Sequence, residues 1–432
     1  MRRCRPLPYG TVRIPYGYVW WVSEGVVVPY DVIVVGARVA GSTTAMLLAR
    51  AGLRVLAVDR AAFPSDTVSS HQVQVPAVAR LARWGLLGRL RSAGTPPTRA
   101  VRFDAGRIVL AGAFPASGGV DAMFSPRRTL LDTVLADAAR SAGAEIRERF
   151  RVERLVWRDG RVAGVRGRCG RGPEVTETSQ LVVGADGKRS LVAAAVGAVA
   201  YREQSVRTFA SYGYWSGVPL DGGELYHRPG CAAAAFPTND DLTMVYVASP
   251  LSEFAAARRD LDGHHLRQLD GCGDLGARVR AGVRAERLRT TPDQPNVLRT
   301  SFGPGWALVG DAGAVMDSVS AQGIAHALAD AESLAHAVVA GLSGSLPLAA
   351  ALAERHRLRD RTVRPMFDLT LRLAELRSRR VDHLMFAALA DRPADAERFF
   401  GALSGTVPAD RFFTPRTVLP LIGAAGWRRL IG

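Results

Sequence analysis

Residues 30–59 carry the strongest fold signal in the sequence, and they read YDVIVVGARVAGSTTAMLLARAGLRVLAVD. Tyr30–Val35 and Leu53–Val58 are short, β-branched runs of the kind that form strands buried on both faces. Ser42–Ala51, between them, has the apolar spacing of a helix, and Gly52 ends it. A strand, a glycine turn, a helix and a second strand in this order predict a right-handed βαβ unit.

The turn of this unit, Gly36-Ala37-Arg38-Val39-Ala40-Gly41, has the frame of a dinucleotide-binding fingerprint. Gly36 suits the tight turn and Gly41 the close helix–strand contact, while Arg38 stands where the middle glycine lets the backbone approach a pyrophosphate. Asp59 ends the second strand, where an acid accepts hydrogen bonds from a ribose diol. The alternative is a βαβ unit without a ligand. Arg38 either reaches a phosphate or points to solvent.

Two later segments extend the pattern. Leu181–Ser190 (LVVGADGKRS) is a predicted strand followed by an Asp-Gly loop, and Trp306–Asp311 (WALVGD) is a strand that ends in Gly-Asp. Ala321-Gln322-Gly323 then opens a helical run. With these three motifs in this order, residues 30–345 resemble the FAD-dependent monooxygenases of the para-hydroxybenzoate hydroxylase type. The GARVAGS turn is similar to an actinobacterial branch of that superfamily, related to geranylgeranyl reductases.

The resemblance implies an α/β fold with a GR2-type, Rossmann-like FAD-binding domain, an inserted antiparallel β-sheet substrate domain and a C-terminal helical region. The expected FAD-binding domain is discontinuous, over 29–100, 125–200 and 296–345; the substrate domain covers 101–124 and 201–295, and the helical region 346–432. Periodicity predicts further helices at 73–83, 127–142, 323–341 and through most of 346–390, and strands at 145–156, 161–167, 180–184, 206–217, 242–248 and 306–310. Residues 1–28 are expected to be a disordered extension or an over-long start.

The same resemblance implies which residues hold FAD. Asp59 and Arg60 would bind the AMP ribose, Arg128 would reach the phosphates, and Asp311 would bind the ribityl chain. The expected cofactor-binding set is Gly36, Arg38, Ala40, Gly41, Asp59, Arg60, Arg128, Asp186, Gly187, Gly310, Asp311, Gln322 and Gly323. The helix that starts at Gly323 would direct its positive end at the flavin pyrimidine, which stabilises the anionic reduced flavin.

Three residues are candidates for a catalytic role: His71, Asp317 and Ser318. Ser318 stands where the family commonly has a proline, which leaves the geometry of that loop open. Asp317 is either a solvent-facing turn residue, the favoured reading, or an acid at the flavin edge. His71 is either a polar loop residue or a group that touches FAD or substrate. The aromatic residues expected to line a substrate pocket are Tyr212, Tyr214, Trp215, Tyr226 and Tyr246, with core packing as the alternative for each.

Composition excludes several classes of protein. The chain has 432 residues and a net charge of +16, but Lys188 is its only lysine and the arginines are scattered, so nucleic acid is not an expected partner. The four cysteines lie far apart without a Cys-x-x-Cys pair, so we expect neither a metal site nor a disulfide framework. This cysteine usage fits a protein of the reducing cytoplasm, which is the expected location. No apolar run approaches the ~20 residues of a membrane span. The oligomeric state stays open.

The favoured function is an NAD(P)H-dependent FAD monooxygenase of secondary metabolism, such as antibiotic biosynthesis. By the resemblance, a C4a-hydroperoxyflavin would hydroxylate or epoxidise an aromatic or polyketide-like small molecule. A flavin halogenase is rejected, because it needs a lysine between flavin and substrate and Lys188 belongs to the Asp-Gly loop. Two alternatives remain: a geranylgeranyl-reductase-like enzyme that reduces a C=C bond of a lipid, and a non-catalytic flavin-binding protein.

Overall fold

The computed structural model describes residues 29–431, so the expected N-terminal extension lies outside the described residues. The predicted βαβ unit is confirmed as β1 (Tyr30–Val35), α1 (Val39–Arg50) and β2 (Val55–Val58), with β1 and β2 paired in parallel. All four residues of β2 are buried, as a strand covered on both faces requires.

The first sheet has the strand order β19 (Phe302–Gly303), β20 (Trp306–Leu308), β10 (Glu174–Gly184), β1, β2 and β7 (Glu145–Arg147). The strands β20, β10, β1, β2 and β7 run parallel, while β8 (Phe150–Arg158) and β9 (Arg161–Cys169) continue from β10 as an antiparallel ribbon. The predicted strand at 145–156 is therefore two strands, β7 and β8. Because the carboxyl ends of parallel strands meet at one edge, the turns after β1, β10 and β20 lie together there.

Two glycines make this meeting possible. Gly36 has φ +98°, and a Cβ on it would lie 2.4 Å from the carbonyl oxygen of Ala185, in the turn after β10. A Cβ on Gly41 would lie 1.7 Å from the carbonyl oxygen of Gly36. The first and last fingerprint glycines therefore fulfil the expected packing roles.

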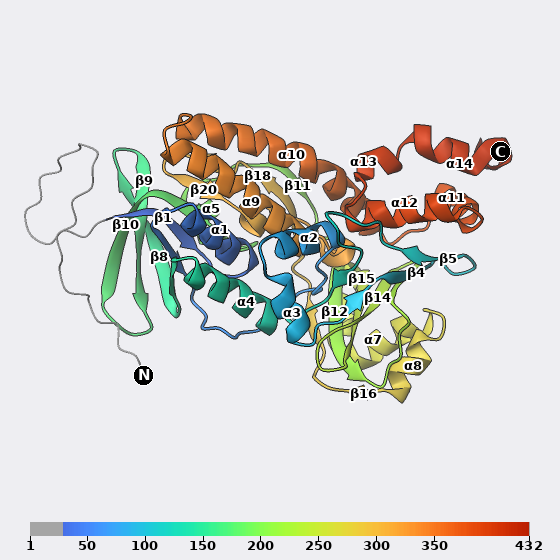
Figure 1. Ribbon diagram of the computed structural model, residues 1–432. Coiled ribbons are helices and arrows are strands. Elements are labelled where there is room, and N and C mark those ends of the chain that lie inside the picture. Colours follow the sequence, from blue (N-terminus) through green and yellow to red (C-terminus); the bar gives the residue numbers. More distant parts are fainter. Residues whose placement is uncertain (1–28, 432) are drawn as a thin grey trace, which may run out of the picture.

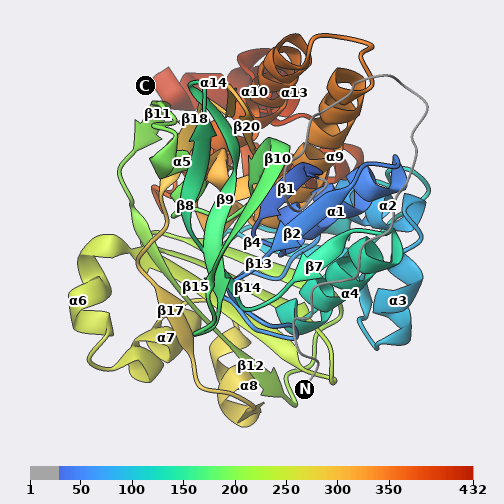
Figure 2. The ribbon, with the colours of Figure 1, turned by 90° about the vertical axis from the view of Figure 1, so that its left-hand side faces the viewer.

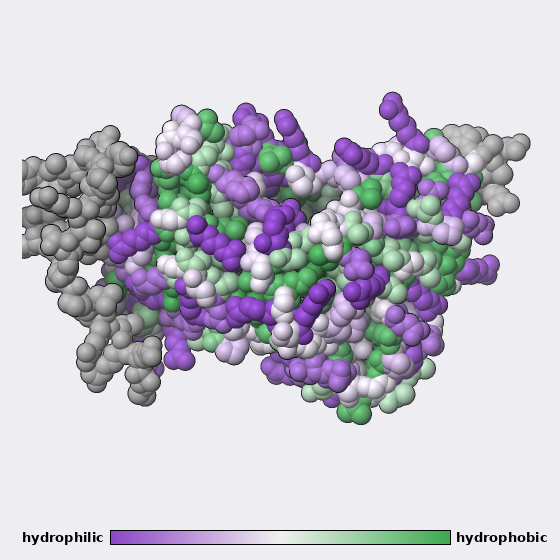
Figure 3. All heavy atoms as spheres, viewed as in Figure 1, coloured by the Kyte–Doolittle hydropathy of each residue, from purple (hydrophilic) through white to green (hydrophobic). Residues whose placement is uncertain are grey.

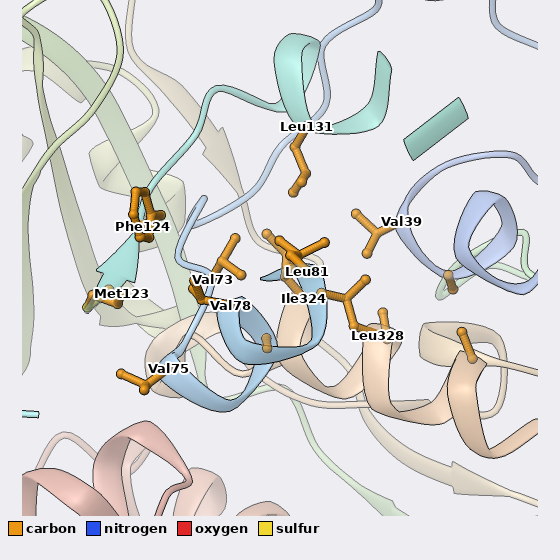
Figure 4. Close-up of a cluster of buried hydrophobic side chains, with 14 of the residues drawn as sticks. Val39, Val73, Val75, Val78, Leu81, Met123, Phe124, Leu131, Ile324 and Leu328 are labelled. Carbon is orange, nitrogen blue, oxygen red and sulfur yellow. The ribbon is translucent and has the colours of Figure 1, made fainter. Parts of the chain in front are cut away.

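Helices cover one face of the first sheet, and the ribbon of β8 and β9 with the short α5 (Leu191–Ala195) covers the other. The long pair α9 (Gly323–Leu342) and α10 (Leu348–Leu373) lies in the upper part of Figure 1. The helices α1, α2 (Val75–Arg83), α4 (Arg128–Ser141) and α9 share an apolar core. Figure 4 shows Val78 and Leu81 of α2 beside Ile324 and Leu328 of α9, with Val39 of α1 close by. The first turns of α1 and α9 are thus held together by packed side chains.

The second sheet lies beside the first (Figures 1 and 2). Its order is β16 (Val283–Arg284), β12 (Thr208–Ser216), β15 (Thr243–Pro250), β14 (Cys231–Pro237), β13 (Gly223–Arg228), β4 (Ala100–Asp104) and β5 (Val109–Ala113), and β17 (Arg289–Thr291) also pairs with β12. The segments 101–124 and 201–295 thus contribute to one sheet, which is antiparallel except where β13 pairs with β4. The helices α7 (Leu261–Asp270) and α8 (Leu275–Ala281) lie beside it.

The remaining elements are short. They are α3 (Leu87–Ser92), α5 (Leu191–Ala195), α6 (Phe254–Ala257), the strand pair β3 (Pro97–Thr98) and β6 (Met123–Phe124), and the small sheet of β11 (Ala200–Gln204), β18 (Asn296–Arg299) and β21 (Ala314–Val315).

The C-terminal region consists of α10 followed by α11 (Arg380–Ala390), α12 (Pro393–Ser404), α13 (Ala409–Phe412) and α14 (Pro415–Ile431). Phenylalanines attach α11 and α12 to β4: the ring of Phe103 packs against Phe386 at 5.0 Å and Phe399 at 5.3 Å between centroids. This region therefore packs on the second sheet through α11 and α12, and on the first through α10.

Hydrophilic side chains are spread over the whole face seen in Figure 3 and do not gather in one block. Within residues 29–431, none of the helices is both long enough and apolar enough to span a membrane.

Candidate functional site

The turn that opens α1 lies at the carboxyl edge of the first sheet. The helix has no side-chain cap and no acid in its first turn, so its first amides are available to an anion. Asp59 is 8% exposed and its carboxylate accepts hydrogen bonds from the backbone amides of Ala37 and Ala61, both at 2.8 Å. Asp59 thus fixes the turn from the end of β2, and the neighbouring Arg60 is exposed.

Arg38 makes contacts that neither sequence alternative describes. Its guanidinium lies 2.6 Å from the carboxylate of Asp132 and also donates to the hydroxyl of Ser65 at 2.9 Å. The fully buried Asp132 accepts further hydrogen bonds from Arg128, at 2.9 to 3.1 Å. Arg38 and Arg128 therefore share one buried carboxylate, and Arg38 fastens the segment at Ser65 to α4.

The Asp-Gly loop after β10 holds α5. The carboxylate of Asp186 accepts a hydrogen bond from the hydroxyl of Ser190 and another from the backbone amide of Val192, at 3.1 Å. Burial raises the pKa of Asp186, and these hydrogen bonds oppose that rise. Asp186 is thus engaged with α5, and Gly187, at φ +79°, continues the loop beyond it.

Asp311 differs from the other acids of the site. Its partly exposed carboxylate has no hydrogen bond or ion pair within residues 29–431. Burial raises the pKa of this carboxyl, and the positive charges of Arg128 and Lys188 act against the rise. The loop at Asp311 therefore faces Arg128 of α4 and Lys188 of the Asp-Gly loop, which brings the three motifs to one place. A carboxylate without a protein partner here is suited to accept hydrogen bonds from the hydroxyls of a ligand.

The helix α9 begins at the same place. It runs for 20 residues from the exposed Gly323, and neither a side-chain cap nor an acid occupies its first turn. The preceding Ala321 has φ +53°, and the side chain of Gln322 donates a hydrogen bond to the carbonyl of Leu403 in α12 at 2.8 Å. The positive end of a long helix is thus available at this edge.

These residues fit FAD. The uncapped N-terminus of α1 and Arg128 suit a pyrophosphate, and the uncapped N-terminus of α9 suits the flavin pyrimidine. Asp59 suits a ribose, and the unpaired Asp311 suits a ribityl chain. Gly310 packs against the first turn of α1, because a Cβ on Gly310 would lie 2.8 Å from the Cβ of Ala40.

Sequence reasoning missed two buried residues, one in α9 and one in α10, that fix the Gly-Asp loop through hydrogen bonds. Asp330, 3% exposed in α9, accepts the backbone amide of Gly310 at 2.9 Å. It is paired with Arg355 of α10 at 2.5 Å, and Arg355 also donates to the carbonyl of Leu308 at 3.0 Å. Burial raises the pKa of Asp330, but the guanidinium of Arg355 and its neighbours bring it below its ordinary value. The available signal was that Asp330 is one of only two acids, with Glu332, in an alanine- and leucine-rich helix.

A cavity lies where the second sheet meets the C-terminal helices. It is bounded by β13, β14, the loop Ser318–Ala321, and α10 and α12, and together with the solvent at its opening it holds about 870 Å³ of space free of protein atoms. Most of its lining is apolar, from residues such as Phe103, Phe114, Leu225, Phe236, Met366 and Leu369. Because Ser318–Ala321 leads directly into α9, the cavity adjoins the expected flavin site.

Of the five expected pocket aromatics, Tyr226 and Tyr246 line this cavity. The expectation is wrong for Tyr212, Tyr214 and Trp215. Side chains alternate along β12, so Trp215 faces the opposite side and stacks on His265 with centroids 5.6 Å apart. Tyr212 and Tyr214 share the inner face, but both are 1% exposed and pack around His71 instead.

His71 does not line the cavity. It is fully buried with φ 63°, and its ring lies 2.7 Å from the carbonyl of Ser69 through Nδ1 and 2.7 Å from the hydroxyl of Tyr214 through Nε2. The carbonyl can only accept, so Nδ1 carries the proton and the Tyr214 hydroxyl donates to Nε2. Burial lowers the pKa of His71 to about 3, which keeps the ring neutral. The ring therefore fixes the loop before α2.

Asp317 is buried and caps the short 3-10 turn Ser318–Ser320, so its interpretation as a solvent-facing turn residue is wrong. It is 1% exposed, and its carboxylate accepts the hydroxyl of Thr208 at 2.6 Å and the amide of Val319 at 2.9 Å. Burial raises its pKa to about 6. Ser318, beside it, lines the cavity and lies 2.9 Å from the hydroxyl of Tyr246.

Comparison with known proteins agrees with this geometry. Residues 29–365 match the family described as "FAD binding domain". A menaquinone reductase of Mycolicibacterium smegmatis is 29% identical over 328 residues, which cover 69% of this chain and 73% of that protein. A tryptophan 2-halogenase of Chondromyces crocatus is 25% identical over 331 residues, covering 74% and 63%. The chain spans 61% and 63% of the length of the first curated relatives that it matches.

Solved structures show the same fold. The flavin-dependent brominase Bmp2 has a TM-score of 0.77 at 17% identity, covering 93% of this chain and all of that one. The probable FAD-dependent monooxygenase pqsL of Pseudomonas aeruginosa has a TM-score of 0.67 at 20% identity, covering 86% and 98%. The chain belongs to the FAD binding domain family.

Proposed function

We propose that this protein is an NAD(P)H-dependent FAD monooxygenase that acts on an apolar small molecule. The observation that carries the proposal is the largely apolar cavity that adjoins the loop Ser318–Ala321, at the start of α9. The overall reaction would take one O₂ and one NAD(P)H with a proton, place one oxygen atom on the substrate and release the other as water. Bound FAD would supply the redox and oxygen chemistry.

The protein's own side chains would position and enclose the substrate. Apolar walls exclude water, and the Tyr246 hydroxyl is held by Ser318, whose hydroxyl also contacts the side chain of Gln294. Burial raises the pKa of Tyr246 far above neutrality, so this hydroxyl stays protonated. No strong general acid or base in the cavity is required, because the cofactor carries the oxygen chemistry.

Halogenation is disfavoured although halogenases share the fold. Lys188 is the chain's only lysine, and its ammonium contacts the backbone carbonyl of Asp293 and lies 3.3 Å from that residue's carboxylate. It does not line the cavity.

Reduction of a C=C bond is the second candidate. The match to a menaquinone reductase over 69% of the chain favours it, and an apolar cavity suits an isoprenoid substrate as well. Non-catalytic flavin binding is tested at the same time, because such a protein would purify with FAD but oxidise no NAD(P)H.

The test is NAD(P)H oxidation by the FAD-loaded protein with a panel of aromatic polyketides and isoprenoid quinones. We expect O₂ uptake that matches NAD(P)H use and a product heavier by one oxygen atom. A product heavier by two hydrogen atoms without O₂ uptake would support the reductase, and it would overturn the monooxygenase.

A further inference from the structure

Two glutamine side chains at the wall of the cavity are deeply buried. Gln72 is 4% exposed and Gln74 is 5% exposed, and both line the cavity. The Nε2 group of Gln74 donates to the carbonyl of Ala321 at 3.4 Å and to Oε1 of Gln72 at 3.3 Å. The two amides therefore form a pair that links the loop before α2 to the loop before α9.

These hydrogen bonds fix which atoms remain for a ligand. A backbone carbonyl only accepts, so the nitrogen of Gln74 must face Ala321, and the oxygen of Gln72 must face that nitrogen. The Nε2 donor of Gln72 and the Oε1 acceptor of Gln74 have no hydrogen-bond partner anywhere in residues 29–431. Neither atom is fully enclosed by protein, so each is open to a hydrogen bond with water or with a ligand in the cavity.

The rest of the lining carries no formal charge. None of the described residues around the cavity is Asp, Glu, Lys or Arg. Burial lowers the pKa of His227, and it raises the pKa values of Tyr226 and Tyr246, so all three are neutral near pH 7. An anionic ligand would thus be stripped of water without gaining a charged partner.

We propose that the cavity binds an uncharged, apolar ring compound, one carbonyl oxygen of which accepts a hydrogen bond from Nε2 of Gln72. The proposal rests on the proposed function, since it names the class of substrate for that site. It distinguishes ketones and quinones from carboxylates and phosphates of similar size. The arginine-rich surface gives no hint of this preference, because its charges lie outside the cavity.

The test is calorimetric binding to the FAD-loaded protein at pH 7.5, without NAD(P)H. The probes are 2-acetonaphthone, 2-naphthoate and 2-ethylnaphthalene, which share a ring system and differ in the presence of a carbonyl and a charge. We expect 2-acetonaphthone to bind at least about tenfold more tightly than 2-naphthoate, and about threefold to tenfold more tightly than 2-ethylnaphthalene.

Two variants locate the contact. Gln72→Leu keeps the volume but removes the donor, so it should abolish the advantage of 2-acetonaphthone over 2-ethylnaphthalene and leave the affinity for 2-ethylnaphthalene unchanged. Ala234→Phe places a large side chain in the cavity and should weaken the binding of both neutral probes to the same extent. FAD content and circular dichroism of each variant show whether it has folded.

Three results would overturn the inference: equal affinity for 2-naphthoate and 2-acetonaphthone, no binding of any probe, or an advantage of the ketone that survives Gln72→Leu. Loss of FAD alone from Gln72→Leu would assign the amide to the cofactor and would also overturn it. Since binding is measured without a reductant, a protein that binds the ketone but forms no oxygenated product would disprove the proposed function and not this inference.

Discussion

Arg38 shows how a departure from a sequence motif is accommodated by a single residue. The missing fingerprint glycine is replaced by a guanidinium that turns away from the inner face of the loop and pairs with Asp132 at 2.6 Å. Arg128 pairs with the same carboxylate. Arg38 compensates the charge of Asp132, so the positive charge of Arg128 is not cancelled and can attract an anionic pyrophosphate while Arg128 keeps its hydrogen bonds to Asp132.

Arg38→Ala is therefore expected to weaken FAD binding by about 5- to 100-fold, because Asp132 would then retain Arg128, and a charge-assisted hydrogen bond is worth about 1–3 kcal/mol. The measurement is titration of the FAD-free protein by flavin fluorescence. In Arg38→Ala/Asp132→Asn the competing carboxylate is gone, and affinity should return to near that of the wild type. If the double variant binds as weakly as Arg38→Ala, the role of Arg38 is to fasten the segment at Ser65 and not to release Arg128.

Asp317 predicts a specific dependence of stability on pH. Its pKa is raised to about 6 by burial, so the folded, FAD-free protein holds the proton more tightly than the unfolded chain. This contribution to the free energy of unfolding is fully present below about pH 4 and is lost as the pH rises to 6. Above pH 6, the free energy of unfolding of Asp317→Asn should exceed that of the wild type by up to about 3 kcal/mol, and this difference should vanish towards pH 4.

The measurement is urea unfolding of the FAD-free wild type and variant between pH 4 and pH 7.5. The control is Asp121→Asn, since the carboxylate of Asp121 is largely exposed and pairs with Arg99 on the surface. A difference between Asp317→Asn and the wild type that does not change with pH would show that the carboxyl does not titrate in this range.

Among the elements, α10 makes the strongest connection between the C-terminal region and the flavin loops. Arg355 reaches from α10 to Asp330, and Asp330 holds the amide of Gly310 at 2.9 Å. Arg359, one turn further on, donates to the carbonyl of Arg299 at 2.9 Å. The helix thus supports the loop that is expected to bind the ribityl chain, and the family match to residue 365 includes both arginines.

Arg355→Met should lower FAD content sharply and destabilise the protein by about 3–5 kcal/mol, because Asp330 would be left as a buried charge without a partner. The matched control is Arg357→Met on the same helix, where the pair with Glu354 is exposed and worth little. The measurements are flavin absorbance per protein and the midpoint of urea unfolding. Equal behaviour of the two variants would contradict the role of α10.

The elements also show how far sequence reasoning reaches. The βαβ unit and the helices α4 and α9 could be predicted, because their apolar periodicity and turn residues are local signals. Which of the aromatic side chains line the cavity could not be predicted. Tyr212, Tyr214 and Trp215 look alike in the sequence, and only the strands that pair with β12 determine their surroundings. The pairing of Asp330 with Arg355 joins two helices, and no local pattern identifies such a pair.

At the scale of the whole molecule, the flavin-site helices, the second sheet and the C-terminal helices share one continuous apolar core. It runs from Val32 in β1 through Phe236 in β14 to Phe399 in α12. The cavity lies inside this core, with walls from all three parts. A ligand that orders one wall is therefore coupled through packed side chains to the others.

We expect the FAD-free protein to unfold in a single thermal transition, because this cluster runs through both sheets and the C-terminal helices, and the two next-largest clusters lie on the outer faces of the same two sheets. FAD at about 100 times its dissociation constant should stabilise the folded state by about 2.7 kcal/mol and raise the unfolding temperature by a few degrees. Asp311→Ala should abolish this rise without lowering the unfolding temperature of the FAD-free protein, since the carboxylate it removes has no partner in residues 29–431. Scanning calorimetry with and without FAD measures both effects. Two separate transitions, only one of which responds to FAD, would show that the second sheet and the C-terminal helices fold independently of the flavin site.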